Sequence, residues 1–361
     1  MKNLFLDANA HVPLSIPAQQ AYIKFQNSDG GRGHPSSPSK AGQLAANALE
    51  TARSQIAILL GAKPSQIIFT STCSQACEWA LNILINKITK LSYSPVEHSS
   101  IKYCIDYLKT KHKSVTFNKL NITKDGVVSP ATDGSVVCVH VQNELGTIQP
   151  IEQFQNTKLL TDMCQSIGKV PINLETSPAD IAVFGGHKFG GSAGLGFIFL
   201  KNIKWYQEFG TGSRYYNDRP GTPDVGAAVA TAAALEDVLL NMPERTDRAK
   251  EFQSTLEPRL EEMGLEIIGK GAPRVSNTTF VHVPNIAMHI LLDLSNQGVI
   301  VGLGSACGSM HTGPSPLMKA LGREGGAHDF IRISQHGEYG KTEALYLADI
   351  FNKSLKQYRR K

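Results

Sequence analysis

The sequence predicts an α/β fold: a large domain around a mainly parallel β-sheet, with a smaller α+β domain beside it. Short apolar runs with the composition of buried strands alternate with segments of helical periodicity, which is the pattern of such folds. A length of 361 residues, 41% of them hydrophobic, suffices for two structural units with sizeable cores. An Ala- and Leu-rich helix ends near Met242-Pro243, and this step is the best candidate for a domain boundary.

The expected elements follow from periodicity and from punctuating residues. Gly61 supplies a stop for a helix whose apolar residues have helical spacing: Leu44, Ala48, Ala52, Ile56 and Leu59. Residues 67–70 have the composition of a short buried strand, and Ser74 can cap the helix that follows. Further strands are expected at residues 136–141, 181–184, 196–200 and 278–282 and around Arg332. Further helices are expected at residues 225–240, 245–263 and 286–297.

Composition and charge exclude several classes of protein. The net charge of +5 is spread along the chain and indicates no nucleic-acid-binding surface. Six cysteines in a chain of this length are not a disulfide framework, and Cys73 and Cys77 without a second pair predict no metal site. The N-terminus lacks a signal-peptide pattern, and the apolar runs are far shorter than the ~20 residues that span a membrane. We therefore expect a cytoplasmic protein with no nucleic-acid or membrane partner.

Three segments contain residues suited to chemistry. The strand, turn and helix start at residues 69–76 would present free N–H groups to a phosphate, although an ordinary capped turn explains the same residues. Lys188 lies among glycines after a strand and could bind an aldehyde cofactor covalently; a Gly-rich hairpin with an exposed Lys is the alternative. Cys307 lies among small residues, where a mobile loop could present a thiolate; a free surface Cys is the alternative.

Ten segments, in order along nearly the whole chain, resemble the cysteine desulfurases of the class V aminotransferase group. The match is very close at residues 140–150, His-Val-Gln-Asn-Glu-Leu-Gly-Thr-Ile-Gln-Pro. The other segments are residues 6–13, 33–42, 68–71, 97–98, 162–169, 186–188, 219–222, 304–307 and 331–334. The Gly-Ser-Ala-Cys form of residues 304–307 is nearer to the nitrogenase and iron–sulfur-assembly type than to the sulfur-mobilisation type.

The resemblance implies a fold-type-I homodimer that depends on pyridoxal 5′-phosphate. The large cofactor-binding domain would span residues 14–242, and residues 1–13 and 243–361 would form the small domain. Lys188 would hold the cofactor and move the Cα proton of the substrate, and His98 would stack on the cofactor ring as an acid–base group. The thiolate of Cys307 would attack the substrate sulfur.

The remaining roles that the resemblance implies concern binding. Asp162 would pair with the pyridine nitrogen and Gln165 with the ring hydroxyl. Asn143, beside the cofactor, and Arg332 would hold the substrate carboxylate, the latter through a bidentate fork. The cofactor phosphate would be bound by four groups: the Cys73 N–H, the Ser74 hydroxyl, His187 and, from the partner subunit, Thr222.

Departures from the family pattern indicate a divergent member. The phosphate turn, Gly-Gly-Thr-Glu in the family, is Thr72-Cys-Ser-Gln75 here, and Gly185 replaces a phosphate-binding Ser. Gln142 replaces the first Asn of the Asn-Asn-Glu motif, and residues 150–160 are too few for the usual helix of about three turns. Because one phosphate hydrogen bond is missing, we expect easier cofactor release than in a typical relative, and slower release after Gly185→Ser.

The implied activity converts L-cysteine to L-alanine and leaves the sulfur as a persulfide on Cys307. An acceptor protein would then take the sulfur for iron–sulfur cluster or other thio-cofactor synthesis. A related lyase or aminotransferase acting on selenocysteine or cystine is an alternative, which would not need Cys307. A non-catalytic sulfur-handling scaffold is a second alternative. The argument against it is the presence of five residues suited to catalysis: Lys188, Asp162, His98, Arg332 and Cys307.

Overall fold

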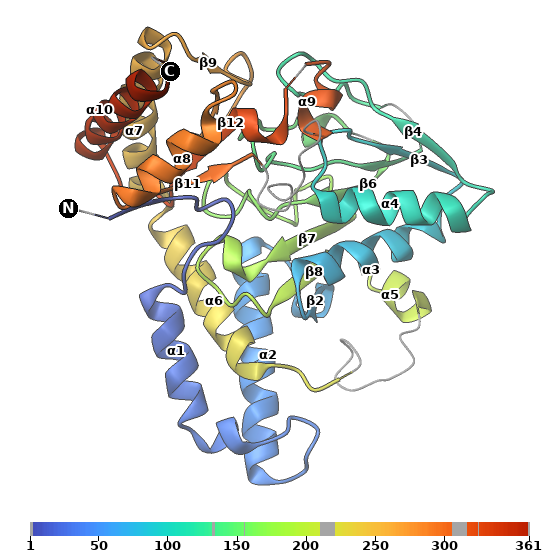
Figure 1. Ribbon diagram of the computed structural model, residues 1–361. Helices are drawn as coiled ribbons and strands as arrows, with labels where there is room; N and C mark the ends of the chain where they lie inside the picture. Colours follow the sequence, from blue (N-terminus) through green and yellow to red (C-terminus); the bar gives the residue numbers. More distant parts are fainter. Residues whose placement is uncertain are drawn as a thin grey trace.

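The computed structural model describes residues 3–131, 134–154, 156–209, 221–304, 316–323 and 325–359. Within these ranges the chain forms two β-sheets, each covered by helices (Figure 1). One sheet is large and mainly parallel, and the other is smaller and mainly antiparallel. The predicted fold class is thereby confirmed.

The large sheet has seven strands in the order β2-β8-β7-β6-β5-β3-β4. Its strands are β2 Ile67–Thr70, β3 Lys90–Tyr93, β4 Thr116–Lys119, β5 Ser135–Val137, β6 Lys158–Asp162, β7 Ile181–Gly185 and β8 Gly196–Leu200. Strands β3 to β7 pair in parallel, and β8 is antiparallel to both β7 and β2. All strands except β8 therefore point the same way, and their carboxyl ends lie along one edge of the sheet.

Helices cover both faces of the large sheet. Alternate strand residues serve the two faces: Phe69 and Phe184 pack on one side, and Ile68 and Val183 on the other. The first side is covered by α1 Ile16–Gln26, α2 Lys40–Leu60 and α6 Val225–Leu240, which lie side by side in Figure 1. The second side is covered by α3 Cys73–Ile85, α4 Ser99–Lys111 and α5 Lys204–Phe209.

The small sheet has five strands in the order β1-β11-β12-β10-β9. They are β1 Leu4–Leu6, β9 Glu266–Ile267, β10 Thr278–His282, β11 Val299–Leu303 and β12 Phe330–Ser334. Its core is shared with α7 Met242–Glu262, α8 Ala287–Asn296 and α10 Lys341–Arg359. Because β1 pairs in parallel with β11, the N-terminal strand belongs to this sheet and the following residues run on towards the large one. A further apolar cluster, which includes Leu317 of α9 Pro316–Ala320, contains residues from both units.

Several expected bounds need correction. Thr72, not Ser74, caps α3: its side chain accepts a hydrogen bond from the Gln75 N–H at 3.2 Å, so Ser74 lies inside the helix. The strand expected at residues 136–141 ends at Val137, because the chain then turns and bridges Val141 to Ile148. Helix α7 begins at Met242 rather than at residue 245, with a proline in its first turn, where no backbone N–H is needed.

Other sequence expectations are confirmed. Gly61 ends α2 with a left-handed φ of 69°, and α6 has the expected bounds. In the short connection before β6, the described residues contain one 3-10 turn, Ile151–Gln153, in place of a full helix. In the described part of the chain no single helix could cross a membrane by length and apolar character; α6 and α7 meet that criterion only together, across a 64° bend.

Candidate active site

The candidate site lies at the carboxyl ends of the parallel strands, where α/β sheets bind their ligands. Asp162 is the last residue of β6, and Lys188 ends the 3-10 turn Gly186–Lys188 that follows β7. His98 is the N-cap of α4, and Cys73 is the first residue of α3. Arg332 comes from β12 of the other sheet, so that both units contribute to the site.

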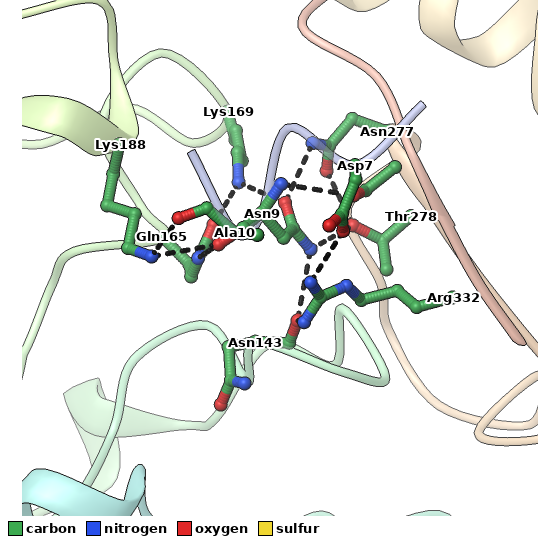
Figure 2. A network of polar contacts seen from close by, with 11 residues as sticks. Asp7, Asn9, Ala10, Asn143, Gln165, Lys169, Lys188, Asn277, Thr278 and Arg332 are labelled. Atoms are coloured by element: carbon green, nitrogen blue, oxygen red, sulfur yellow. Dashed lines mark hydrogen bonds and ion pairs between the residues drawn. The ribbon is translucent and has the colours of Figure 1, made fainter. Parts of the chain in front are cut away.

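Lys188 reaches across to the segment that follows β1. Its Nζ donates hydrogen bonds to the backbone oxygens of Asn9, at 2.9 Å, and Ala10, at 2.8 Å (Figure 2). Burial lowers the pKa of the Lys188 amine, and the nearby Arg332 charge lowers it further. The amine is thus closer to the neutral, nucleophilic form than an exposed lysine is.

Asn9 connects the N-terminal segment to both units. Its side-chain nitrogen donates to the Thr278 hydroxyl at 2.9 Å and to the Asn143 carbonyl at 3.1 Å. Its side-chain oxygen accepts from Lys169 Nζ at 2.8 Å, and the same amine donates to Gln165 (Figure 2). Gln165 in turn donates to the Asn9 backbone oxygen at 2.9 Å. The orientation of the Gln165 amide is therefore fixed by two partners.

Arg332 is almost fully buried and is held by two contacts. Its guanidinium donates to Asp7 Oδ1 at 2.7 Å and to the Asn143 backbone oxygen at 3.3 Å (Figure 2). Its Nε has no hydrogen-bond partner among the described residues, although it is buried. A Cβ on Gly302 would lie 2.5 Å from Asp7 Oδ1, so this position on β11 leaves room for the ion pair. A bidentate anion such as a carboxylate suits the remaining donor capacity of Arg332.

Asp162 and His98 face the same space. Asp162 is 5% exposed, and its Oδ1 accepts from the Cys164 N–H at 2.9 Å. Burial lowers the pKa of His98, while the Asp162 carboxylate raises it and the charges of Lys188 and Arg332 lower it. His98 Nδ1 accepts from the Ser100 N–H at 3.2 Å, which leaves the proton of the neutral ring on Nε2.

The start of α3 has the features of an anion site. The first N–H groups of a helix have no intrahelical partner. The Ser74 hydroxyl lies 3.2 Å from the Ser100 hydroxyl, which links this turn to His98. His187 Nδ1 is buried and has no hydrogen-bond partner in the described ranges. Burial lowers the pKa of His187 to about 4, so its ring is neutral at pH 7 and can donate from one nitrogen.

The position of Gly185 is explained by its neighbour. A Cβ at residue 185 would lie 3.0 Å from the Cβ of Cys73 and 3.3 Å from Cε1 of His187. The side chain of Cys73 thus fills the space next to Gly185. The two departures from the family pattern at residues 73 and 185 are therefore spatial neighbours.

The structure brings most of the residues predicted from sequence to one place. The clustered residues are Lys188, Asp162, His98, Gln165, Asn143, Arg332, His187, Cys73 and Ser74. The Thr222 hydroxyl lies 3.3 Å from His34 Nε2 of its own chain. Cys307 lies outside the described residues.

Sequence reasoning missed three residues of the cluster: Asp7, Asn9 and Lys169. All three lie within segments that resembled the family, but none was given a role. For Asp7 and Lys169, the presence of a charged residue inside a segment that resembles the family could have indicated a place in the site. For Asn9 no sequence signal indicated a hub, since its contacts come from residues 134 to 269 positions away.

The comparisons with known proteins agree with this geometry. The family model described as aminotransferase class V matches residues 4–343. The chain is 27% identical to a cysteine desulfurase IscS of Dictyoglomus turgidum, over 99% of this chain and 96% of that protein. It is 29% identical to a cysteine desulfurase IscS of Pectobacterium carotovorum, over 99% and 93%. A solved structure described as a NifS-like protein has a TM-score of 0.84 at 25% identity, over 98% of this chain and 100% of that one. Since the family model covers nearly the whole chain, the protein belongs to the class V aminotransferases.

Proposed function

We propose that the protein is a cysteine desulfurase that depends on pyridoxal 5′-phosphate. The observation that supports this most directly is the meeting of the Lys188 amine, whose pKa is lowered, with a buried Asp162 carboxylate and a buried Arg332 guanidinium around His98. The fold-type-I architecture and the full-length similarity to proteins named cysteine desulfurase support the same activity.

The residues present fit the cofactor. Its phosphate would be held at the start of α3, by the Cys73 N–H and the Ser74 hydroxyl, and the buried, unpaired Nδ1 of His187 would gain a partner there. Asp162 would hold a proton on the pyridine nitrogen, and Gln165 would donate to the ring hydroxyl. When bound, the cofactor supplies an electron sink for the substrate carbon that loses its proton.

The protein's own groups would perform the remaining steps. The lowered pKa of Lys188 provides a free amine that can attach the cofactor and later take the Cα proton of the substrate. To do so, Nζ must leave the two carbonyl oxygens that it contacts in this structure. His98, whose Nδ1 is fixed by Ser100, would offer Nε2–H as the acid–base group.

Substrate binding would use Arg332. Its two contacts leave part of the guanidinium to bind a carboxylate, and Asn143 adjoins it through its backbone oxygen. The thiolate of Cys307 would take the sulfur of L-cysteine, so that L-alanine and a protein persulfide form. A homodimer in which Thr222 reaches the partner's phosphate site, an acceptor protein for the sulfur and a cytoplasmic location are part of this proposal.

An absorbance spectrum of the purified protein, recorded with and without L-cysteine, tests the proposal. We expect a visible band that changes on addition of cysteine, alanine as product, and extra sulfur on the peptide that contains Cys307. Cys307→Ser should keep the spectral change and form very little alanine. A protein without the band would contradict the enzyme assignment, and full alanine production by Cys307→Ser would indicate a lyase.

A further inference from the structure

Two thiols are in direct contact at the floor of the candidate site. Cys73 Sγ, at the start of α3, lies 2.8 Å from Cys164 Sγ, two residues after Asp162. A disulfide bond is about 2.05 Å long, so the two sulfurs need to approach by less than ~1 Å to form one. The segments that bear them are 91 residues apart in the chain, so tertiary folding alone creates this contact.

The arrangement leaves room for the pair. Gly185 lies against Cys73, and a Cβ at that position would be 3.0 Å from the Cys73 Cβ. Cys73 is half-buried, whereas Cys164 is 7% exposed. Cys73 is therefore the more accessible residue of the two, and Cys164 is placed to react with the product of its oxidation.

We propose that Cys73 and Cys164 form a redox-active pair that hydrogen peroxide converts to a reversible disulfide. In the first step the Cys73 sulfur attacks one peroxide oxygen, the O–O bond breaks, and a sulfenic acid and water form. In the second step the Cys164 sulfur attacks the sulfenic sulfur, and a second water leaves. The two sulfurs together lose two electrons, which reduce one peroxide to two waters. A dithiol reductant reverses the change.

The environment of the pair makes its oxidation slow. The contact with Cys164 lowers the pKa of Cys73, but the contact with Cys77 and burial raise it to well above its usual value overall. The contact with Cys73 and burial likewise raise the pKa of Cys164. Because the thiolate is the reactive form, we expect a slower reaction than at an exposed, ionised cysteine.

Two features of the cluster must be controlled in the test. Cys77 Sγ lies 4.0 Å from Cys73 Sγ and is a competing partner on the same helix. The sulfurs of Cys73 and Cys164 and a carboxylate oxygen of Asp162 also lie within 4.8 Å of one another. A thiophilic cation bound by these three groups would protect the thiols from oxidation. The protein is therefore treated with a chelator, and Cys307→Ser serves as the background so that the thiol of residue 307 forms no disulfide.

The experiment maps disulfides after treatment with hydrogen peroxide. The protein is alkylated without reduction and digested with trypsin, which does not cleave before Pro64 and therefore releases residues 54–87, with Cys73 and Cys77, and residues 159–169, with Cys164. We expect a cross-linked peptide that joins these two and is separated by dithiothreitol. Cys77→Ala and Cys104→Ser should retain the cross-link, whereas Cys164→Ala should lose it.

Other outcomes would overturn the proposal. They are loss of the cross-link in Cys77→Ala, oxidation of the thiols only to sulfinic acids, or cross-links only to Cys104 or Cys138.

The thermal unfolding midpoint is an independent measurement, because a link that closes a long loop restricts the unfolded chain. It should rise on oxidation in the Cys307→Ser protein and be restored by dithiothreitol. An unchanged midpoint with the cross-link present would show that the native site is strained by the bond. If Cys164→Ala does not fold, the map of the Cys77→Ala protein still decides which two sulfurs are joined.

Discussion

The amine of Lys188 combines two properties: the residue is half-buried, and the two hydrogen-bond partners of the amine are neutral carbonyl oxygens. Neutral acceptors compensate the positive charge less than a carboxylate would, and burial lowers the amine pKa. The site therefore favours the free amine that carbonyl chemistry requires.

Lys188→Ala should abolish covalent attachment of the cofactor, because the amine of Lys169, which also lies in the cluster, is held by the side chains of Asn9 and Gln165. The visible absorbance should disappear on dialysis or after cysteine treatment. Borohydride reduction followed by peptide mapping checks this, with Lys169→Ala as a comparison that keeps the attachment site. A borohydride-stable adduct in Lys188→Ala would show that another lysine binds the cofactor.

Asp7 should position Arg332 and stabilise the fold. Breaking a buried ion pair leaves an uncompensated charge and costs about 3–5 kcal/mol, and the 19% exposure of the Asp7 side chain moderates this. We expect Asp7→Ala to lower the free energy of unfolding by about 2–3 kcal/mol, measured by urea denaturation. We also expect the KM for L-cysteine to rise several-fold more than kcat falls.

An exposed ion pair supplies the control for this prediction. The side chains of Arg248 and Glu244 are 52% and 65% exposed, so Glu244→Ala should change the unfolding free energy by less than about 1 kcal/mol. If Asp7→Ala and Glu244→Ala lower the unfolding free energy equally, burial of the Asp7–Arg332 ion pair contributes nothing to stability.

At the scale of secondary-structure elements, the contact between β7 and α3 changes the expected effect of Gly185→Ser. The sequence comparison suggested that Gly185→Ser would restore a phosphate contact and slow cofactor release. The structure shows that the new Cβ would lie 3.0 Å from the Cys73 Cβ, at the start of α3. The expected gain is therefore offset by crowding at the phosphate turn itself.

Gly185→Ser alone should lower the unfolding free energy by about 1–3 kcal/mol, as overpacked substitutions do, and should not slow cofactor release. Combining it with Cys73→Gly removes the clashing Cβ. The double variant should then be more stable than the sum of the two single effects predicts, by at least about 0.5 kcal/mol. Urea denaturation of the wild type, the two single variants and the double variant measures these free energies. If the two changes in unfolding free energy simply add, the phosphate turn accommodates the new side chain without a cost in stability.

At the scale of the whole molecule, stability should depend on pH through buried ionisable groups. Glu97 is 2% exposed, and one of its oxygens accepts from the Val139 N–H. Burial and the Asp162 charge raise the pKa of Glu97 to about 8. Between pH 4.5 and 8 the folded state holds this proton while the unfolded chain loses it, so the free energy of unfolding falls as the pH rises through this window. The half-buried His140 and His187, whose pKa values are lowered to about 4, act in the opposite direction: through them the free energy of unfolding falls as the pH drops below 6.5.

The Glu97 contribution is isolated by comparison with Glu97→Gln above pH 6.5. One pKa unit corresponds to about 1.4 kcal/mol, so Glu97 should remove up to about 2 kcal/mol between pH 6.5 and 8. The amide does not titrate, and Glu97→Gln should therefore lose less stability over the same range. Urea unfolding of both proteins at the two pH values measures the difference, and parallel losses would show that Glu97 titrates normally.

The sequence by itself determined the architecture and most of the candidate site. Continuous apolar runs indicate strands that are buried on both faces, and Gly61 ends α2 because only a residue without a Cβ adopts a left-handed φ readily. The ordered motifs also placed Lys188, Asp162 and Arg332 in one family pattern. These features depend on local periodicity or on residues close in the chain, which a sequence displays directly.

Only the tertiary structure decided which distant groups touch. The Asp7–Arg332 pair, the Asn9 hub and the Cys73–Cys164 contact join residues 91 to 325 positions apart, and their partners are set by how the two sheets pack. The end of β5 at Val137 was likewise missed, because the apolar pattern continues and the backbone N–H groups of Cys138 and His140 still bond to β6 before Val141 bridges to Ile148. Local sequence constrains backbone conformation and burial, whereas polar pairing at a site depends on the relative positions of elements that only the packed core fixes.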